Sequence, residues 1–324
     1  MKQQILALLS QRQGNFLSGA ELSARLKISR TAVWKHIKSL KEEGYRILAS
    51  PRRGYLLLER PDLLTETEIR SGLETRIFGQ KVVFLPLLDS TNEEAKRLAA
   101  AGAPEGTVVV SEQQEKGKGR IGRQWLSPPK VGLWFSLILR PAIMPVFAAQ
   151  LTFVSAVAIC QALKEATGLP LTLKWPNDLL WAGKKVGGIL TELSAEIEKI
   201  NYIIVGTGIN VNQKEEDLPP ELKEMAVSLQ MAAGRPFHRA ALLQVILAKY
   251  EEQYHTYLQD GFAPILQAWR ELNSILGQEV VVKSPEGSFA GRAEDVNADG
   301  CLLVRKASGE LETVIVGDVS IRVK

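Results

Sequence analysis

Cysteine and histidine are scarce in this chain, and their scarcity excludes several kinds of site. The 324 residues include two cysteines, Cys160 and Cys301, and three histidines, His36, His238 and His255. Two cysteines so far apart in sequence supply neither a disulfide framework nor the ligands of a structural zinc site. Each histidine lies in a helical pattern outside the motifs described below, and we assign none to catalysis. The cysteine usage predicts a protein of the reducing cytoplasm.

The two best-known nucleotide-binding motifs are also missing. The sequence has no G-x-x-x-x-G-K-[ST], and no G-x-G-x-x-G follows a predicted strand with an acidic residue further on. A P-loop kinase and a Rossmann dehydrogenase are therefore disfavoured. Hydrophobic residues make up 45% of the chain, charged residues 23%, and the formal charge is +4. These values are ordinary for a soluble globular protein, and the length predicts two or three domains.

One uncharged run, residues 141–163, is long enough in principle to cross a bilayer. Two prolines and several polar side chains interrupt this run: Pro141, Pro145, Gln150, Thr152, Ser155 and Gln161. We interpret it as a buried helix that starts after Pro145, because proline is tolerated in a first helical turn. The N-terminus lacks the apolar core of a signal peptide. We therefore predict neither export nor a membrane partner.

Residues 1–62 predict a winged helix-turn-helix domain. Ser18 and Glu21 form a capping box that begins a second helix, and Ser29 can cap a third. Two strands at 45–48 and 55–58 follow, joined by a basic turn that would form the wing. The alternative is a small helical module that binds protein. For the DNA-binding interpretation we expect these contacts: Arg30, Thr31, Trp34, Lys35, Lys38, Arg52 and Arg53.

The remaining chain predicts an α/β (α+β) region, residues 63–272, followed by a small β-barrel, residues 273–324. Central strands are expected at 82–87, 107–111, 132–139, 171–175, 185–192 and 202–211, and helices near 91–101, 146–167 and 239–258. The strands at 171–175 and 185–192 lie too close for a helical crossover, which favours a mixed sheet over a doubly wound parallel one. After residue 277 short strands alternate with glycine turns, among them Pro285-Glu286-Gly287.

The glycine-basic loop, residues 117–125, alternates three glycines with Lys118, Arg120 and Arg123 and ends at Trp125. Glycine lets backbone amides approach an anion closely, and the cations supply the opposite charge. Trp125 could cover an aromatic base. A flexible, charged hairpin tip would have the same composition, so this segment leaves both interpretations open.

Four other segments carry polar residues that a plain core does not require. They are Asp89-Ser90-Thr91-Asn92, Lys174-Trp175-Pro176-Asn177-Asp178, the strand that begins Lys184-Lys185-Val186-Gly187-Gly188, and Gly206-Thr207-Gly208-Ile209-Asn210-Val211. Taken singly, the first is an ordinary helix cap and the second an ordinary tight turn. The third places lysines beside a strand whose glycines allow close backbone approach.

Together, the five segments resemble the motifs of the biotin protein ligases. The loop resembles GRGRxGRxW, KWPND stands intact at 174–178, and GKKVGGIL and GTGINV follow at 183–190 and 206–211. The winged helix and the C-terminal SH3-like barrel are similar to the flanks of the bifunctional members, which also repress transcription. Two departures are Lys118, where the family often has arginine, and the apolar Ile121. Lysine keeps the charge at 118 but loses the planar fork of arginine.

The resemblance implies that biotin's carboxylate attacks the α-phosphate of ATP, which gives biotinoyl-5′-AMP and pyrophosphate. A reaction between two anions needs cations that neutralise charge, and Arg120 and Lys185 are the expected catalytic residues. Biotin would be bound by Ser90, Thr91, Asn92, Gln114, Lys118, Gly119, Arg120 and Lys185. The nucleotide would be bound by Arg123, Trp125, Asn177, Asp178 and Asn210, with Mg²⁺ as cofactor and its ligands unassigned.

The resemblance also implies two macromolecular partners. The acyl group would pass to a lysine of the biotin carboxyl carrier protein of acetyl-CoA carboxylase. Biotinoyl-5′-AMP would then act as corepressor, ordering the loop and promoting a homodimer that binds operator DNA. We expect the loop to be mobile in the empty protein and ordered over the adenylate. The alternatives are a biotin-sensing repressor without ligase activity and a lipoate ligase.

Overall fold

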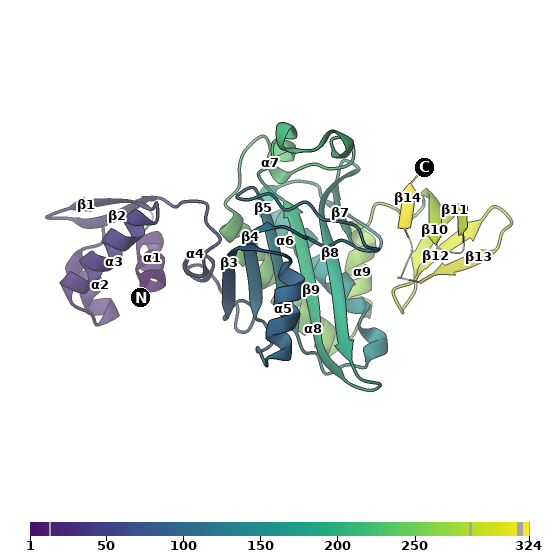
Figure 1. Cartoon of the computed structure of the whole chain (residues 1–324), viewed down its shortest axis with the longest axis horizontal. Coiled ribbons are helices and arrows are strands. Elements are labelled where there is room, and N and C mark those ends of the chain that lie inside the picture. Colours follow the sequence, from purple (N-terminus) through teal and green to yellow (C-terminus); the bar gives the residue numbers. More distant parts are fainter. Residues whose placement is uncertain (13, 285–286, 316–319, 324) are drawn as a thin grey trace.

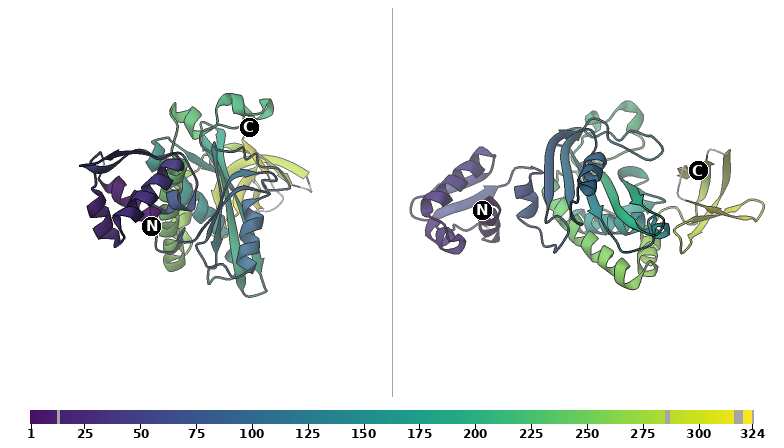
Figure 2. Two further views of the ribbon diagram at one scale, coloured as in Figure 1. Left: turned by 60° about the vertical axis from the view of Figure 1, so that its left-hand side comes forward. Right: turned by 60° about the horizontal axis from the view of Figure 1, so that its bottom comes forward.

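The computed structural model describes residues 1–12, 14–284, 287–315 and 320–323, the last four without their side chains. Three bodies follow one another in chain order and lie in a row, with the N-terminal helices at one end and the C-terminal sheet at the other (Figure 1). The second view of Figure 2 shows the same row from another side. The expected three-part organisation is therefore present.

The N-terminal body contains α1 (Lys2–Gln11), α2 (Gly19–Leu26), α3 (Arg30–Glu42) and the antiparallel pair β1 (Arg46–Ser50) and β2 (Gly54–Glu59). Both predicted caps form: the Ser18 hydroxyl accepts from the amide of Glu21, and the Ser29 hydroxyl accepts from that of Ala32. The body has a hydrophobic cluster of its own: Ile5, Leu6, Leu9, Leu17, Leu22, Val33, Ile37, Leu40, Tyr45 and Ile47.

The junction after β2 is held by buried charged groups. Glu68, in α4 (Glu66–Arg70), is 1% exposed and accepts hydrogen bonds from Tyr45 and, at 2.6 Å, from Arg60 Nη1. Asp62 accepts at 2.9 Å from the backbone amide of Arg239 and at 2.8 Å from its Nε. The winged-helix body is thus tied through α4 and residues 60–62 to the central body.

The central sheet is mixed, as predicted, with the order β3-β4-β5-β9-β8-β7-β6. Its strands are β3 (Val82–Leu88), β4 (Val108–Gln114), β5 (Gly132–Leu139), β6 (Thr172–Lys174), β7 (Asp178–Trp181), β8 (Lys184–Ala195) and β9 (Ile200–Asn210). β3 and β4 are parallel, and the other pairs are antiparallel. β7 was not predicted.

Helices cover both faces of this sheet. α5 (Thr91–Ala100) packs on the face that contains Val109, whereas α6 (Gln150–Thr167) and α8 (Arg239–Asp260) share a core with Val108 and Val110. This alternation follows from the two-residue period of a strand. The described part of the central body also contains α7 (Leu229–Ala233) and α9 (Ala263–Leu272), and neither helix was predicted.

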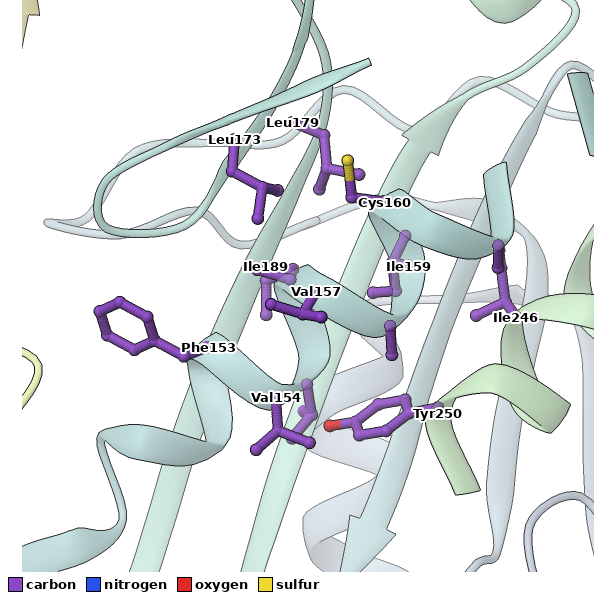
Figure 3. Close-up of a cluster of buried hydrophobic side chains, with 14 of the residues drawn as sticks. Phe153, Val154, Val157, Ile159, Cys160, Leu173, Leu179, Ile189, Ile246 and Tyr250 are labelled. Carbon is purple, nitrogen blue, oxygen red and sulfur yellow. The ribbon is translucent and has the colours of Figure 1, made fainter. Parts of the chain in front are cut away.

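The uncharged run forms a core helix. Among the described residues, one helix, Pro145–Thr167, is long and apolar enough to cross a membrane, and 72% of its most apolar window is buried. Figure 3 shows Val154, Val157 and Cys160 of this helix among apolar side chains from the sheet strands and α8. A short 3₁₀ turn at Pro145–Phe147 precedes α6. The prediction of a buried helix after Pro145 is confirmed.

The C-terminal body is an antiparallel sheet with the order β13-β12-β11-β10-β14. Its strands are β10 (Glu279–Ser284), β11 (Gly287–Val296), β12 (Leu302–Lys306), β13 (Leu311–Val314) and β14 (Ser320–Val323). Pro285 and Glu286 of one expected turn lie outside the described residues. Closure into a barrel stays a prediction. So does the domain boundary near 273, because side chains of this sheet belong to the same hydrophobic cluster as the central body.

Candidate active site

A cavity of about 1660 Å³ opens at the end of the central sheet where all five sequence motifs meet. Its walls come from the start of α5, the glycine-basic loop, the KWPND turn, strands β8 and β9, and the segment 213–226. A smaller cavity of about 580 Å³ adjoins the same loop and is lined by Asn177 and Glu192. Segments far apart in sequence therefore form one site.

At the start of α5, buried polar groups form a continuous network. The backbone amide and hydroxyl of Thr91 both donate to Gln114 Oε1, at 2.8 and 3.0 Å, and Gln114 Nε2 donates to Ser127 Oγ at 2.8 Å. Ser136 Oγ lies 2.8 Å from Thr91 Oγ1. Ser90 occupies the N-cap position without a side-chain capping bond. Gln114 thus supplies the acceptor for a free backbone amide at the start of α5, which an N-cap side chain usually supplies. The Ser90 hydroxyl makes no capping bond.

The Asn92 side chain is 3% exposed and fits only because residue 206 is a glycine. Its Oδ1 accepts from Ser136 at 2.6 Å, and its Nδ2 donates to Glu192 at 2.6 Å and to the Leu190 carbonyl at 3.3 Å. A Cβ on Gly206 would lie 2.0 Å from Asn92 Oδ1. The first glycine of the GTGINV motif therefore makes room for a buried carboxamide. Ser136 and Glu192 were not predicted as members of this site.

The glycine-basic loop is a short hairpin. The Gly119 amide donates to the Arg123 carbonyl at 2.7 Å, and the Trp125 amide donates to Gly117 at 2.8 Å. Ile121 and Gly122 at its tip both have positive φ, 57° and 67°. Two positive φ values in succession characterise the type I′ turn of tight hairpins, although a β-branched residue is rare there. The loop therefore has hairpin backbone geometry, and it also lines the cavity. Its mobility and its role in anion binding stay predictions.

The loop's cations reach three different places. Arg120 Nη1 donates to Asn177 Oδ1 of the KWPND turn at 3.2 Å. Lys118 Nζ lies 2.6 Å from Glu93 on α5, with both side chains nearly half exposed. This hydrogen bond, followed by one from Lys96, lowers the pKa of Glu93. Arg123 is exposed at the rim of the cavity.

Lys185, Asp178 and Trp125 line one part of the cavity wall, here called the lysine floor. Lys185 Nζ lies 2.5 Å from Asp178 Oδ1 and 5.2 Å from the centre of a Trp125 ring. A Cβ on Gly208 would lie 2.5 Å from Trp125 Nε1, so the second glycine of GTGINV lets the indole lie directly on β9. The loop and the sheet thereby share one packed aromatic contact.

Asn210 lies at the far end of this floor. Its Nδ2 donates to the Val227 carbonyl at 3.4 Å, and its Oδ1 accepts from Gln213 Nε2 at 3.2 Å. The segment around Val227 is bound to β8, because the amide of Val227 donates to Lys185 and that of Lys185 donates to Met225. Gln213 was not predicted; no motif marks it, although it stands three residues after Asn210.

All seven residues expected to contact DNA are exposed on the winged-helix body, on α3 and on the turn between β1 and β2. The Arg53 guanidinium lies 4.0 Å from the Phe16 ring centre. Lys38 Nζ lies 5.8 Å from the Trp34 ring centre. Basic side chains therefore gather on the helix and wing, as a DNA-binding surface requires.

The mixed sheet carries the glycine-basic hairpin, the lysine floor and a buried pocket formed by Thr91, Asn92 and Gln114, here called the amide pocket. Together these features define a protein of the biotin and lipoate ligase class. The sequence comparisons agree. Residues 84–210 match the Biotin/lipoate A/B protein ligase family, residues 2–56 an HTH domain, and residues 275–322 the Biotin protein ligase C terminal domain. The chain belongs to the bifunctional ligase/repressor BirA family.

Individual relatives support this membership. The chain is 43% identical over 309 residues to the bifunctional ligase/repressor BirA of Bacillus subtilis (strain 168), with 95% of each chain covered. It is 30% identical over 321 residues to BirA of Escherichia coli (strain K12), covering 98% of this chain and 96% of that one. A biotin protein ligase from Aquifex aeolicus, solved with biotin and ATP, superposes with a TM-score of 0.66 at 33% identity, covering 76% of this chain and all of that one. The expected function, a biotin protein ligase that is also a repressor, is confirmed at the level of the family.

Proposed function

We propose that this chain forms biotinoyl-5′-AMP from biotin and ATP in the described cavity and transfers biotin to a lysine of the biotin carboxyl carrier protein. The carrying observation is that two cations, Arg120 and Lys185, line the same cavity as the network of Thr91, Asn92 and Gln114 and the indole of Trp125. Attack of a carboxylate on a phosphate requires positive charge at that point.

The amide pocket is the proposed biotin half of the site. Thr91, Asn92 and Gln114 form its fixed network, with Ser90 at the helix N-terminus beside them. A ring with urea-type donors and acceptors fits such a network, because its polar atoms can exchange hydrogen bonds with prearranged partners. Gly119 of the hairpin would cover this half, and Lys118 would join it after release from Glu93.

The part of the cavity beside Trp125 is the proposed nucleotide half. The proposed nucleotide-binding residues all line the cavity: Arg123, Trp125, Asn177, Asp178 and Asn210. Arg120 and Lys185 would contact the biotin carboxylate and the α-phosphate together, holding both anions in line. Pyrophosphate leaves, and the acceptor lysine then attacks the acyl carbon and displaces AMP.

Mg²⁺ is the proposed companion of ATP, and the donors at hand fit it. Mg²⁺ is commonly held by one or two carboxylates together with substrate phosphates. The described residues contain no cluster of three or more metal-binding side chains. Asp178 would supply one carboxylate, and Asn177 and Asn210 line the same cavity. When bound, the ion would neutralise phosphate charge.

The test is a mass measurement on an acceptor domain incubated with the chain, ATP, Mg²⁺ and either biotin or lipoate. We expect a mass gain with biotin and none with lipoate. A gain with lipoate alone would favour a lipoate ligase, and no gain with either would leave a biotin-sensing repressor.

A second function, repression, is favoured by the exposed basic face of α3 and the wing. In this proposal Arg30, Thr31, Trp34, Lys35 and Lys38 lie in the major groove, and Arg52 and Arg53 contact phosphate. The working compartment would be the cytoplasm. Binding to a twofold-symmetric operator is expected to strengthen when biotin and ATP are both present, and unchanged affinity would refute the corepressor role.

The corepressor would act by favouring a homodimer. Apolar side chains are exposed at Met144, Val146 and Phe147 before α6, and at Leu193 and Ile197 near the end of β8. On β8, pairing with β7 ends at Gly188, so residues beyond it offer a strand edge near this apolar surface. Sedimentation velocity with and without biotin and ATP tests this; a monomer in both conditions would contradict it.

A further inference from the structure

Helix α3 presents one large apolar side chain to solvent, that of Trp34, which is 53% exposed. The structure describes every residue of this helix, and its other large apolar side chains, Val33, Ile37 and Leu40, are buried. Trp34 belongs neither to the hydrophobic cluster of the winged-helix body nor to the side chains packed against it. An indole outside the core is a typical binding residue, because tryptophan is enriched at the centres of interfaces.

Cations surround this indole. Arg30 and Lys38 stand four residues before and after Trp34, so each lies one turn away on the same face of α3, and Lys35 adjoins them. Lys38 Nζ lies 5.8 Å from the centre of the Trp34 ring. The first acidic residue of α3 is Glu42, at its last position. Positive charge around an apolar centre favours a polyanion over an apolar protein surface as the partner.

The major groove of DNA offers an indole one kind of apolar group. The base-pair edges there present hydrogen-bond acceptors and amino donors, and thymine adds its C5-methyl group. Covering polar edges with ring carbons removes their water without replacing the hydrogen bonds. Contact with the methyl group instead removes apolar surface of both partners from water. An indole in the groove therefore matches thymine better than it matches the other bases.

We propose that Trp34 determines the operator specificity of this chain by packing its indole against the C5-methyl group of a thymine in the major groove. The proposal rests on the repressor function proposed above and names the base that α3 selects. Arg30, Lys35 and Lys38 supply affinity around the indole, and Trp34 supplies discrimination between bases.

The experiment first finds the bound sequence and then removes single methyl groups from it. Duplexes that the full chain retains from a random pool, with biotin and ATP present, give the half-site. Each thymine is then replaced in turn by deoxyuridine, which lacks the C5-methyl group and keeps the base pair. For the unmodified chain we expect one thymine per half-site at which this replacement raises the Kd about fourfold, or about fifteenfold in both half-sites together, the value of one buried methyl group each.

Trp34→Ala should lose this sensitivity, so that deoxyuridine at the same thymine changes the Kd by about 1.5-fold or less. The variant changes an exposed helical position to a strong helix former, so α3 should remain folded. It removes no charge, and the slope of log Kd against log salt should stay unchanged. The matched control is Leu58→Ala on β2 of the same body, where the leucine is 49% exposed. This control should keep the full sensitivity to deoxyuridine.

The proposal is overturned if deoxyuridine weakens binding of the unmodified chain at no thymine, because the indole then reads no methyl group. It is also overturned if Trp34→Ala keeps the full sensitivity, since another side chain then makes the contact. A salt slope reduced by about 0.9 in Trp34→Ala would assign Trp34 to a phosphate contact and overturn it as well. If the random pool yields no preferred sequence, the proposed repressor function has failed instead.

Discussion

Replacing Gly206 by alanine adds one methyl group at the point where β9 meets the amide pocket. The new Cβ would lie 2.0 Å from Asn92 Oδ1 and 2.7 Å from its Cγ. Because β9 is paired on both sides, with β5 and β8, the Asn92 side chain must move and the strand cannot. We therefore expect Gly206→Ala to damage the biotin half of the site selectively.

The size of the effect follows from the hydrogen bonds that Asn92 would lose. The bond from Ser136 Oγ is between neutral groups, worth about 1 kcal/mol, and the bond to Glu192 is charge-assisted, worth about 1.5 to 3 kcal/mol. If the biotin complex needs Asn92 in its present place, about 2.5 to 4 kcal/mol is lost from binding. At 1.4 kcal/mol per factor of ten, the Kd for biotin should rise about 60- to 700-fold.

Isothermal titration calorimetry with biotin measures this Kd directly. The matched control is Gly19→Ala on the winged-helix body, where the new Cβ would lie 3.5 Å from the Tyr55 ring, an ordinary contact. The control should bind biotin as the unmodified chain does. A folded Gly206→Ala variant with a Kd within about threefold of the unmodified chain would refute the placement of biotin beside Asn92.

Three further changes probe other parts of the molecule. Glu68→Ala removes the acceptor of the Tyr45 hydroxyl and the carboxylate paired with Arg60, so urea unfolding should show a loss of about 3 kcal/mol, and a loss below 1 kcal/mol would count against a structural junction. Burial raises the pKa of Cys160 to about 12 from an ordinary value near 9, so the unfolded chain loses the thiol proton first and the unfolding free energy falls as pH rises through that interval. Cys160→Ala should make the fall shallower in urea titrations from about pH 8 to 11, and an identical fall would contradict this. Arg52→Ala should reduce the slope of log Kd for operator DNA against log salt by about 0.9, whereas an unchanged slope would remove Arg52 from the phosphate contacts.

Much of the fold could be predicted from the sequence because the decisive signals are local. Capping serines, the uncharged helix and the glycine turns act within a few residues. β7 was missed because it begins at Asp178, the last residue of the KWPND motif, and its four residues are too few to show a period. The helix expected near 239–258 ended close to the end of α8, but α9 was missed, because it has only ten residues and begins at Ala263 with a proline next to it.

The site was predictable where glycines and cations stand together in a motif. It was not predictable where single polar residues come from distant strands: Ser136 and Glu192 hold Asn92 from β5 and β8, and no spacing in the sequence links them. Outside the site, the buried ion pairs of Arg239 were missed for the same reason, because its partners Asp62 and Glu112 are more than a hundred residues away in sequence. Hydrogen bonds of this kind appear only after the sheet order is known.

The central claim is that Lys185 faces the reacting anions, and two adjacent lysines allow a matched test. Lys185 lines the cavity and its Nζ forms an ion pair with Asp178, whereas Lys184 Nζ donates to the Lys223 carbonyl at 3.0 Å. The measurement is the single-turnover rate of biotinoyl-5′-AMP formation for Lys185→Gln and Lys184→Gln. We predict a fall of about 100- to 1,000-fold for Lys185→Gln and less than threefold for Lys184→Gln. Equal rates for the two variants would contradict the proposed active site.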